Sequence, residues 1–276
     1  MEEGRPSGTA HGAAMLRAAH QLLDDPRVLE DPLALRMIGA QSEAALRSDP
    51  ARFQTPELRH LRAFIAMRSR YAEDELAEAV RRGVCQYVVL GAGLDTFAYR
   101  NPFHDALRVF EVDHPATQAW KRERLREGSI PLPDSLTFAP VDFERETLGE
   151  GLRSAGFRTG DLTFFSWLGV TVYLTEAAVM ETLEFVASST PADSEIVFSF
   201  VPQPSASKGS VGQRAAALGE PWLTFFDPPA LERDLGRMGF AHVEHLEPRD
   251  ANRRYFENRT DGLCIAGTGH LMKARV

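Results

Sequence analysis

Two glycines and two acids stand at a spacing that could form a nucleoside-binding site. The segment Gly91-Ala92-Gly93 follows a short apolar run. Glycine lets a backbone turn tightly and approach a ligand where a Cβ atom would collide. Glu111 and Asp113 follow about twenty residues later, where an acid at the end of the next strand can accept hydrogen bonds from a ribose diol. We therefore predict that these five residues contribute to a cofactor site.

The glycine pattern also restricts the kind of cofactor. Nicotinamide dinucleotides and S-adenosylmethionine both present a ribose at this position. The third glycine, which lets a pyrophosphate-binding helix pack closely against the strand, is missing from residues 91–96. A cofactor without a pyrophosphate fits better, and a glycine turn that binds nothing is the structural alternative. We expect Asp95 to brace the turn through backbone hydrogen bonds, and Arg100 to take part in an ion pair.

A further acid and an aromatic residue, Asp142 and Phe143, follow a later apolar run. At the edge of a sheet Asp142 could accept a hydrogen bond from an adenine amino group while Phe143 covers one face of the ring. The same two residues could equally be an aspartate that opens a loop and a phenylalanine of the core. The sequence leaves both interpretations open.

The segment Trp167–Thr175 follows the next apolar run and would border both the cofactor and the substrate. We assign Trp167 and Leu168 to the cofactor site. Tyr173 is a catalytic candidate, because its hydroxyl could donate a hydrogen bond or line the channel of the transferred group. Core packing, with the hydroxyl satisfied locally, is the alternative.

Arg68 is the remaining candidate, both as a catalytic and as a cofactor-binding residue. The planar guanidinium group suits a carboxylate, whether of a methionine-type cofactor or of a substrate. A surface salt bridge is the alternative for Arg68 and for Arg70, two positions further on. Arg17 is a weaker candidate of the same kind.

An alternation of strands and helices from residue 86 onward must position these residues. Such an alternation implies right-handed crossovers and a largely parallel sheet, whose carboxyl ends meet at one edge. Strands are expected at 87–90, 108–112, 136–140, 162–167, 195–201, 242–246 and 263–266, and the sequence leaves open whether the last one continues toward Lys273. Helices are expected at 116–126, 147–155, 176–188 and 228–238, the last two capped by Thr175 and Asp227.

Residues 1–83 are expected to form an N-terminal helical extension that caps the substrate. Within it we predict disorder over 1–12, a helix from Ala13 toward Leu23, and a helix that starts with Asp31 as its N-cap. Two further helices are expected at 58–67 and 71–82, the second ending at Gly83. Residues 84–276 would be the cofactor-binding domain, with a lid insertion around 202–222.

The composition argues against several classes of protein. The chain has 276 residues, 43% of them hydrophobic, which is enough for one globular unit with a substantial core. Its formal charge of −8 does not suit a broad nucleic-acid-binding face. A signal peptide and an apolar run long enough to cross a bilayer are both missing, so we expect a cytoplasmic protein that binds no membrane.

Cysteine, histidine and motif content exclude further chemistry. Cys85 and Cys264 stand far apart and are expected to be buried free thiols. The histidines have no metal-ligand spacing, and His114 could act either as a base or as a helix start. Neither a nucleophile elbow nor a phosphate loop is present, which argues against a hydrolase or a kinase.

Taken together, these segments resemble the leucine carboxyl methyltransferase-like group of class I S-adenosylmethionine-dependent methyltransferases. The resemblance spans most of the chain and fades over 202–222 and near the C-terminus. It implies an α/β, Rossmann-like, seven-stranded and mostly parallel sheet, with S-adenosyl-L-methionine as the cofactor. The segments that carry it are 88–100 (VVLGAGLDTFAYR), 110–115 (FEVDHP) with Lys121, 141–143 (VDF), 169–175 (GVTVYLT), 9–10 (TA), 31–34 (DPLA) and 68–70 (RSR).

The resemblance also implies roles for individual residues. Gly91 would contact the methionine part of the cofactor, Asp113 with Glu111 the ribose, Asp142 with Phe143 the adenine, and Arg68 a carboxylate. Many relatives carry a glutamate where this chain has Leu168, so a polar cofactor contact is lost and the pocket beside Gly169 should be more apolar. Eukaryotic members methylate the C-terminal carboxylate of a protein, a substrate that nothing in this sequence indicates.

We therefore expect an O-methyltransferase that acts on a carboxylate or hydroxyl group of a small molecule, as bacterial members do, often in secondary metabolism. The acceptor would bind under the extension and the lid, where Trp222, Phe225 and Phe226 either line the pocket or belong to the core. A nicotinamide-dependent oxidoreductase and a cofactor-binding regulatory protein without catalysis are the alternatives. The sequence leaves the oligomeric state open, a homodimer included.

Overall fold

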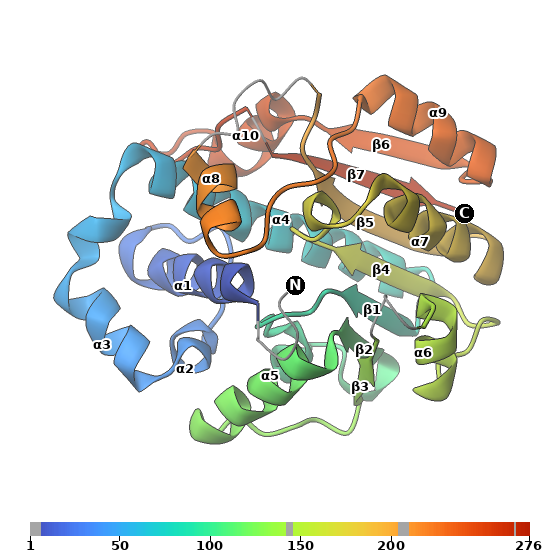
Figure 1. The fold of residues 1–276 in the computed structure, drawn as a ribbon, viewed down its shortest axis with the longest axis horizontal. Helices are drawn as coiled ribbons and strands as arrows, with labels where there is room; N and C mark the ends of the chain where they lie inside the picture. The colour runs from blue at the N-terminus through green and yellow to red at the C-terminus, as the bar shows by residue number, and fades with distance from the viewer. Residues whose placement is uncertain (1–6, 142–145, 204–209, 268) are drawn as a thin grey trace.

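The computed structural model of the protein describes residues 7–141, 146–203, 210–267 and 269–276. These residues form a seven-stranded sheet with the order β3-β2-β1-β4-β5-β7-β6 (Figure 1). The five neighbouring strands β3, β2, β1, β4 and β5 pair in parallel. Strand β7 lies between β5 and β6 and pairs antiparallel with both. The prediction of a seven-stranded, mostly parallel sheet is confirmed. The strands are β1 (Gln86–Leu90), β2 (Arg108–Asp113), β3 (Leu136–Pro140), β4 (Thr163–Trp167), β5 (Glu195–Phe200), β6 (His242–Leu246) and β7 (His270–Arg275).

The central strand β1 is buried along its whole length because helices cover both faces of the sheet. Its side chains alternate between two apolar clusters. Tyr87 and Val89 belong to one cluster, and Val88 and Leu90 belong to the other. A strand that is packed on both faces gives the loop after it a rigid support.

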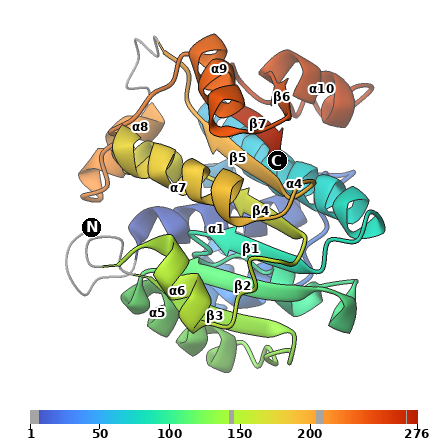
Figure 2. The same ribbon diagram turned by 90° about the vertical axis from the view of Figure 1, so that its right-hand side faces the viewer.

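Helices form a layer on each face of the sheet, and Figure 2 shows the sheet between α7 and α4. On one side lie α4 (Pro56–Arg81), α5 (Pro115–Glu127) and α10 (Pro248–Phe256). On the other side lie α6 (Leu148–Ser154), α7 (Glu176–Ser189) and α9 (Pro228–Met238). Thr175 and Asp227 cap α7 and α9 as predicted.

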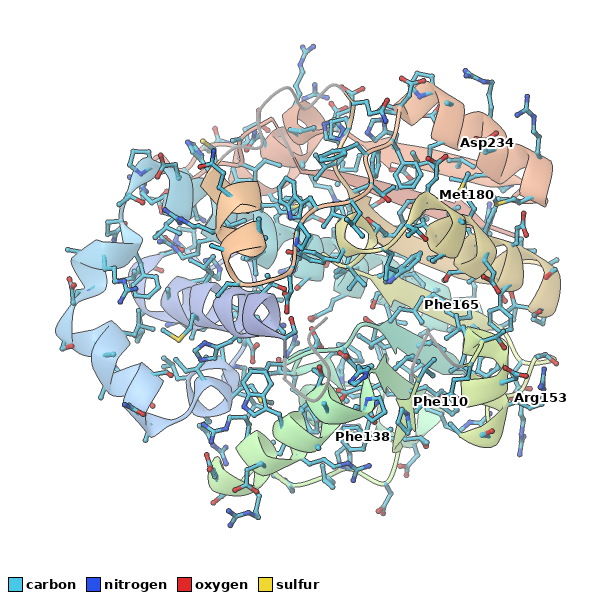
Figure 3. All side chains as sticks on the ribbon, viewed as in Figure 1. Phe110, Phe138, Arg153, Phe165, Met180 and Asp234 are labelled. Carbon is cyan, nitrogen blue, oxygen red and sulfur yellow. The ribbon has the colours of Figure 1, made fainter. Side chains whose placement is uncertain are left out.

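Aromatic side chains join the strands on the face that α6, α7 and α9 cover. Phe110 of β2 and Phe165 of β4 (Figure 3) lie 5.8 and 6.2 Å from Phe157, measured between ring centroids. All three rings are buried. Tilted and edge-on aromatic contacts of this kind are favourable beyond the burial of their area. They fix β2 and β4 on either side of β1, and with them the strand ends that carry the candidate site.

The two helices predicted at 58–67 and 71–82 are one continuous helix, α4, so the predicted break at residues 68–70 was wrong. Thr55 caps the helix by accepting a hydrogen bond from Leu58 N. Arginine and serine are tolerated inside helices, and nothing at this point requires a break. As a result Arg68 is partly buried while Arg70, two residues further round the helix, is exposed.

The N-terminal extension differs from the prediction at two helix starts. Helix α1 spans Gly8–Leu23, with Ser7 as N-cap, so the prediction of disorder was wrong for residues 8–12. Helix α2 (Ala34–Ile38) begins three residues after the predicted cap, and α3 (Ala40–Ser48) follows it. Asp31 is 1% exposed and accepts hydrogen bonds from Leu33 N and from Thr96 Oγ1, 2.6 Å away. This buried aspartate serves a tertiary contact instead of capping α2.

The C-terminal part holds three further differences. The predicted strand at 263–266 is wrong, because these residues form no strand and β7 lies at His270–Arg275. Leu263 and Ile265 are buried like strand residues, but the Asn252 side chain hydrogen-bonds both the N–H and the C=O of Ile265. Helix α8 (Ser210–Ala217) lies within the predicted irregular stretch, and α10 was not predicted.

None of the helices in the described part of the chain combines the length and the apolar character needed to cross a membrane. Cys85 and Cys264 are both free thiols, and each is partly exposed where burial was predicted.

Candidate functional site

The predicted glycine turn follows β1 and lies against the loop that follows β4. Gly91 and Gly93 have φ angles of +64° and +46°, which L-residues with a side chain rarely adopt. A Cβ atom on Gly91 would also collide with the Val170 side chain. Gly91 is therefore required twice, by its backbone conformation and by the close approach of Val170.

Asp113, at the end of β2, braces this turn. Its carboxylate accepts hydrogen bonds from Gly93 N at 2.6 Å and from His114 N at 2.7 Å. The N–H of Ala92 donates to Val112 O at 3.0 Å. Burial raises the pKa of Asp113, and the two backbone N–H donors act in the opposite direction. The structure thus brings Gly91, Ala92, Gly93 and Asp113 together, as the sequence predicted.

Glu111 has a different environment although it lies only two residues before Asp113. Its side chain is 1% exposed, and Oε2 forms an ion pair with Lys121 Nζ of α5 at 2.7 Å. Tyr99 Oη also donates to Oε2, at 3.2 Å. Burial raises the pKa of Glu111 to about 7 against the opposing effect of Lys121. The side chain therefore joins β2 to α5, and its contact with a ribose remains a prediction.

The predicted adenine contacts cannot be placed, since Asp142 and Phe143 lie outside the described residues. The residue before them, Val141, is fully buried and donates a hydrogen bond from its N–H to Asp113 O at 3.0 Å. The chain therefore leaves β3 directly beside the end of β2.

Arg68 lies against the loop after β4. Gly169 has a φ of +77°, and a Cβ atom there would collide with the Arg68 guanidinium. The Arg68 Nε atom is buried and has no hydrogen-bond partner within the described part of the chain. Burial lowers the pKa of Arg68 to about 10. Arg70, by contrast, is exposed and pairs with Asp74 at 2.7 Å, which is the surface salt bridge that was the alternative.

A buried guanidinium is costly unless an anion pairs with it. Among the described residues Arg68 forms no ion pair, and its aromatic neighbour Phe64 lies with its ring centroid 5.7 Å from the guanidinium carbon. The arrangement therefore suits a negatively charged ligand.

The other predicted site residues at the carboxyl end of β4 are Trp167, Leu168 and Tyr173, and they face different parts of the structure. Trp167 is 2% exposed and belongs to the apolar cluster under α6, α7 and α9. Leu168 packs at the rim of the opposite cluster. Tyr173 ends the short 3-10 helix η4 (Thr171–Tyr173) and lies close enough to Arg68 to favour its charged form. The Trp167 indole thus lies in the core, while Tyr173 lies within electrostatic range of Arg68.

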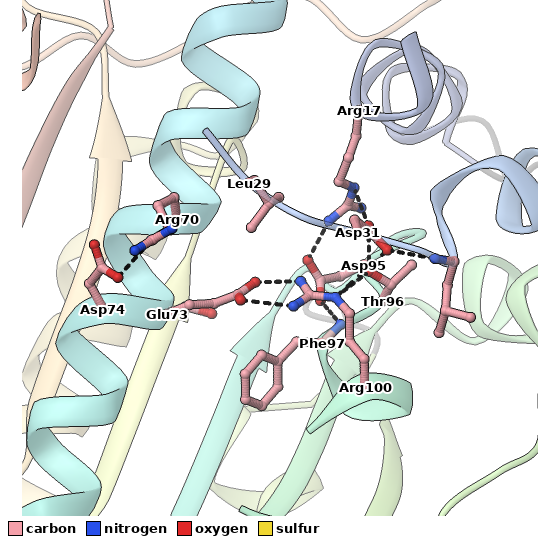
Figure 4. Close-up of polar contacts among 12 residues, drawn as sticks. Arg17, Leu29, Asp31, Arg70, Glu73, Asp74, Asp95, Thr96, Phe97 and Arg100 are labelled. Carbon is pink, nitrogen blue, oxygen red and sulfur yellow. Dashed lines mark hydrogen bonds and ion pairs between the residues drawn. The ribbon is translucent and has the colours of Figure 1, made fainter. Parts of the chain in front are cut away.

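A charge network, whose partners in the N-terminal extension the sequence did not identify, ties that extension to the glycine turn (Figure 4). Arg17 of α1 pairs with Asp95 at 2.9 Å and donates to Leu94 O at 2.9 Å. Arg100 forms a bidentate ion pair with Glu73 of α4. Burial would raise the pKa of Asp95, but Arg17 and other cations hold it at about 2. The predicted supports are confirmed: Asp95 also accepts from Phe97 N at 2.8 Å.

A segment between α8 and α9, residues 218–226, crosses the same edge of the sheet, and we call it the strap. Leu223 N donates to Val172 O at 2.7 Å, and Thr224 Oγ1 donates to Leu174 O at 2.5 Å. The strap is thereby fixed to the residues on either side of Tyr173. Phe226 is buried in the core, which is the second of its two predicted interpretations. Trp222 Nε1 is buried and has no hydrogen-bond partner among the described residues.

Among the described residues, no group of three or more His, Cys, Asp and Glu side chains is arranged so that it could hold a metal ion. His114 caps α5, since its Nδ1 accepts a hydrogen bond from Ala116 N at 3.2 Å. Of its two predicted roles, the structure therefore shows the helix start.

Comparison with known proteins gives a consistent result. The family model described as "Leucine carboxyl methyltransferase" matches residues 10–187. A Bacillus subtilis protein named "Putative S-adenosyl-L-methionine-dependent methyltransferase YktD" is 32% identical over 99% of both chains. A Mycobacterium marinum protein named "Putative S-adenosyl-L-methionine-dependent methyltransferase" is 32% identical, over 77% of this chain and 69% of the length of that protein.

Solved structures support the fold. A protein from Thermobifida fusca, whose structure is described as that of a "putative methyltransferase", superposes with a TM-score of 0.57. It is 16% identical and the superposition covers 99% of this chain and 96% of that one. The matched family region contains α4, the glycine turn, Asp113 and the Gly169 loop. The chain therefore belongs to the leucine carboxyl methyltransferase family.

Proposed function

We propose that this protein is an S-adenosyl-L-methionine-dependent O-methyltransferase that methylates a carboxylate or hydroxyl group of a small molecule. We extend the proposal to a cytoplasmic role in secondary metabolism. One observation carries it: the partly buried Arg68 has a buried Nε atom without a hydrogen-bond partner and no acidic partner in the described part of the chain, and it lies against Gly169 at the carboxyl edge of the sheet. A carboxylate such as that of the methionine moiety would complete this site.

The residues present fit S-adenosyl-L-methionine. Gly91, Gly93 and Gly169 all have positive φ angles, and a Cβ atom on Gly169 would displace the Arg68 guanidinium from its place beside the turn. Arg68 would hold the amino-acid carboxylate of the cofactor. Asp113 would hold the ribose, because a carboxylate that accepts two N–H bonds keeps further lone pairs for hydroxyl groups.

A nicotinamide cofactor fits less well. Pyrophosphates bind where the N-terminus of a long helix follows the glycine turn. Here the turn leads into η2 (Phe97–Arg100), a 3-10 helix of four residues.

When bound, S-adenosyl-L-methionine supplies a methyl group that is already activated on a sulfonium, with a neutral thioether as leaving group. The residues of the chain then need mainly to align the acceptor oxygen with the methyl group and to exclude water. Tyr173 lies close enough to Arg68 to favour its charged form, and from there it could donate a hydrogen bond that orients the acceptor. A carboxylate acceptor needs no general base, which agrees with the lack of a catalytic triad at this edge within the described residues.

The strap and α1 support a small acceptor over a protein substrate. Both cover the carboxyl edge of the sheet, and hydrogen bonds join the strap to residues 172–174. Trp222 offers an apolar ring on this cover, together with a buried N–H that has no partner among the residues that the structure describes. An acceptor with an apolar body and an oxygen atom would match that wall.

The test supplies S-adenosyl-L-methionine with a labelled methyl group and a small-molecule extract of bacterial cells to the purified protein. The proposal expects S-adenosylhomocysteine to form and the label to enter a low-molecular-weight product. Release of the label as methanol in mild alkali would identify a methyl ester, and retention would identify an ether. Cofactor binding without S-adenosylhomocysteine in any extract would instead support a regulatory protein, and label in the macromolecular fraction alone would contradict a small acceptor.

A further inference from the structure

The carboxylate of Glu220, on the strap, sits on the first turn of α1. It accepts hydrogen bonds from Gly8 N at 3.1 Å, from Thr9 N at 3.2 Å and from Ser7 Oγ at 3.2 Å. Thr9 Oγ1 donates to the same carboxylate. These groups are separated from Glu220 by more than 200 positions in the sequence. The contact is therefore a tertiary one that joins the strap to the N-terminal extension.

This position uses the electrostatics of the helix. Helix α1 has 16 residues and carries no acidic residue in its first turn. The free N–H groups and the dipole of a helix favour a negative charge at its N-terminus. Ser7 already caps Ala10 N at 3.1 Å, and Glu220 satisfies the two preceding N–H groups. Glu220 thus replaces the local acid that α1 lacks.

The same end of α1 lies on the glycine turn. A Cβ atom on Gly93 would stand 3.1 Å from the Cβ atom of Ala10, one residue after Thr9. Two turns further along, Arg17 holds Leu94 and Asp95. Since α1 touches the glycine turn at both places, the position of its first turn determines how closely the turn is covered.

The strap is fixed at its other end beside Tyr173, through Leu223 and Thr224. Residues 220–224 therefore bridge α1 on one side of the edge and the loop after β4 on the other. In Figure 1, α8, which precedes the strap, lies beside α1. The bridge thus joins the two segments that border the proposed cofactor site, the glycine turn through α1 and the loop after β4 through residues 172–174.

We propose that Glu220 is a positioning residue that fastens the strap to the first turn of α1 and so controls how fast the bound cofactor dissociates. The inference rests on the proposed function, because it takes S-adenosyl-L-methionine as the ligand of the glycine turn. Glu220 touches neither the glycine turn nor Arg68 and acts through Gly8, Thr9 and Ala10. It was not among the residues predicted from the sequence.

The test measures dissociation of S-adenosyl-L-methionine carrying a tritiated methyl group, after an excess of unlabelled cofactor is added. Glu220→Gln keeps the size of the side chain and removes the charge that α1 binds. We expect the dissociation rate to rise about ten-fold, as for the loss of charge-assisted hydrogen bonds. Thr9→Val removes one donor only and should give a smaller increase. Glu181→Gln, an exposed glutamate on α7, should leave the rate unchanged.

Limited proteolysis gives a second readout that does not depend on the cofactor. Trypsin should cut after Arg214, in α8, faster in Glu220→Gln than in the wild type when no ligand is present. An unchanged dissociation rate in both Glu220→Gln and Thr9→Val would overturn the inference, even if the variants melt at a lower temperature. If the wild type bound no S-adenosyl-L-methionine at all, the proposed function would fail instead, and the inference with it.

Discussion

Replacing Lys121 by methionine should destabilise the protein in a manner that depends strongly on pH. Lys121 Nζ and Glu111 Oε2 are 2.7 Å apart, and each side chain is 1% exposed. Methionine keeps much of the length of the lysine stem and removes the only cation that the described residues place in an ion pair with Glu111. The Glu111 carboxylate would then be buried without a counter-charge.

The magnitude follows from the burial of this pair. Removing one partner of a buried ion pair typically costs about 3–5 kcal/mol. Glu111 has a folded-state pKa of about 7, above its ordinary value of 4.5. A raised carboxyl pKa favours the folded state below pH 4.5, and this contribution is lost as the pH rises through 7. Without Lys121 the pKa rises further, so the variant should lose about 3–5 kcal/mol at pH 8.5 and clearly less at pH 6.

Urea unfolding at pH 6 and at pH 8.5 provides the assay, with the wild type, Lys121→Met, and the double variant Glu111→Gln/Lys121→Met. The double variant should be more stable than Lys121→Met at pH 8.5, because it leaves no buried charge. Arg126→Met, which breaks an exposed pair with Glu123 on the same helix, is the matched control and should not change the unfolding midpoint. Equal losses for Lys121→Met at both pH values would refute the reasoning.

Three further predictions concern the glycine turn, its support and the strap. Gly91→Ala should lower the free energy of unfolding by at least about 1 kcal/mol through its positive φ, and adding Val170→Ala should restore part of the loss, as measured by urea unfolding. Asp95→Asn should lower the melting temperature at pH 7 by breaking the ion pair with Arg17. Because the pKa of Asp95 is lowered to about 2, its contribution is present above about pH 4 and disappears as the pH falls toward 2, so thermal melts of Asp95→Asn and wild type should converge there. Trp222→Phe keeps an aromatic ring without the N–H and should raise the KM for the acceptor found in the labelling experiment while leaving the affinity for S-adenosyl-L-methionine unchanged.

The central strands of the sheet could be predicted because β1 and β4 are short, mostly apolar runs that are buried along their whole length. Gln86–Leu90 shows this most clearly, since burial on both faces removes any need for polar positions. The predicted strand at 263–266 failed for a related reason. Leu263 and Ile265 are buried, but a side-chain amide from α10 takes the hydrogen bonds of Ile265 that a neighbouring strand would take. Apolar character indicates burial, and it does not identify the hydrogen-bond partner.

The part of the site that could be predicted consists of residues close in sequence to a strand end. Gly91, Gly93 and Asp113 come together because parallel strands carry their carboxyl ends to one edge. The sequence could not show that Glu111 and Asp113 have different environments, because the buried ion-pair partner of Glu111 is Lys121 on α5. The environment of Trp167 likewise depends on helices from other parts of the chain, α6 before it and α7 and α9 after it.

Contacts between segments that are far apart in the chain could not be predicted from the sequence. The contact of Glu220 with Gly8 and Thr9 joins positions more than 200 residues apart, and no local pattern marks either side of it. The pairing of Arg17 with Asp95 is of the same kind. Such contacts depend on how the extension packs on the sheet, which hydrophobic periodicity alone does not determine.

The central claim is that Arg68 binds the carboxylate of the methionine moiety, and calorimetry with two ligands tests it most directly. S-adenosylhomocysteine carries that carboxylate, whereas 5′-methylthioadenosine lacks the whole amino-acid end. Arg68→Met should weaken binding of S-adenosylhomocysteine by about ten- to a hundred-fold, as expected for a hydrogen bond to a charged group. It should leave 5′-methylthioadenosine unaffected, and Arg70→Met should change neither affinity. Equal losses for both ligands in Arg68→Met, or no loss for S-adenosylhomocysteine, would contradict the account.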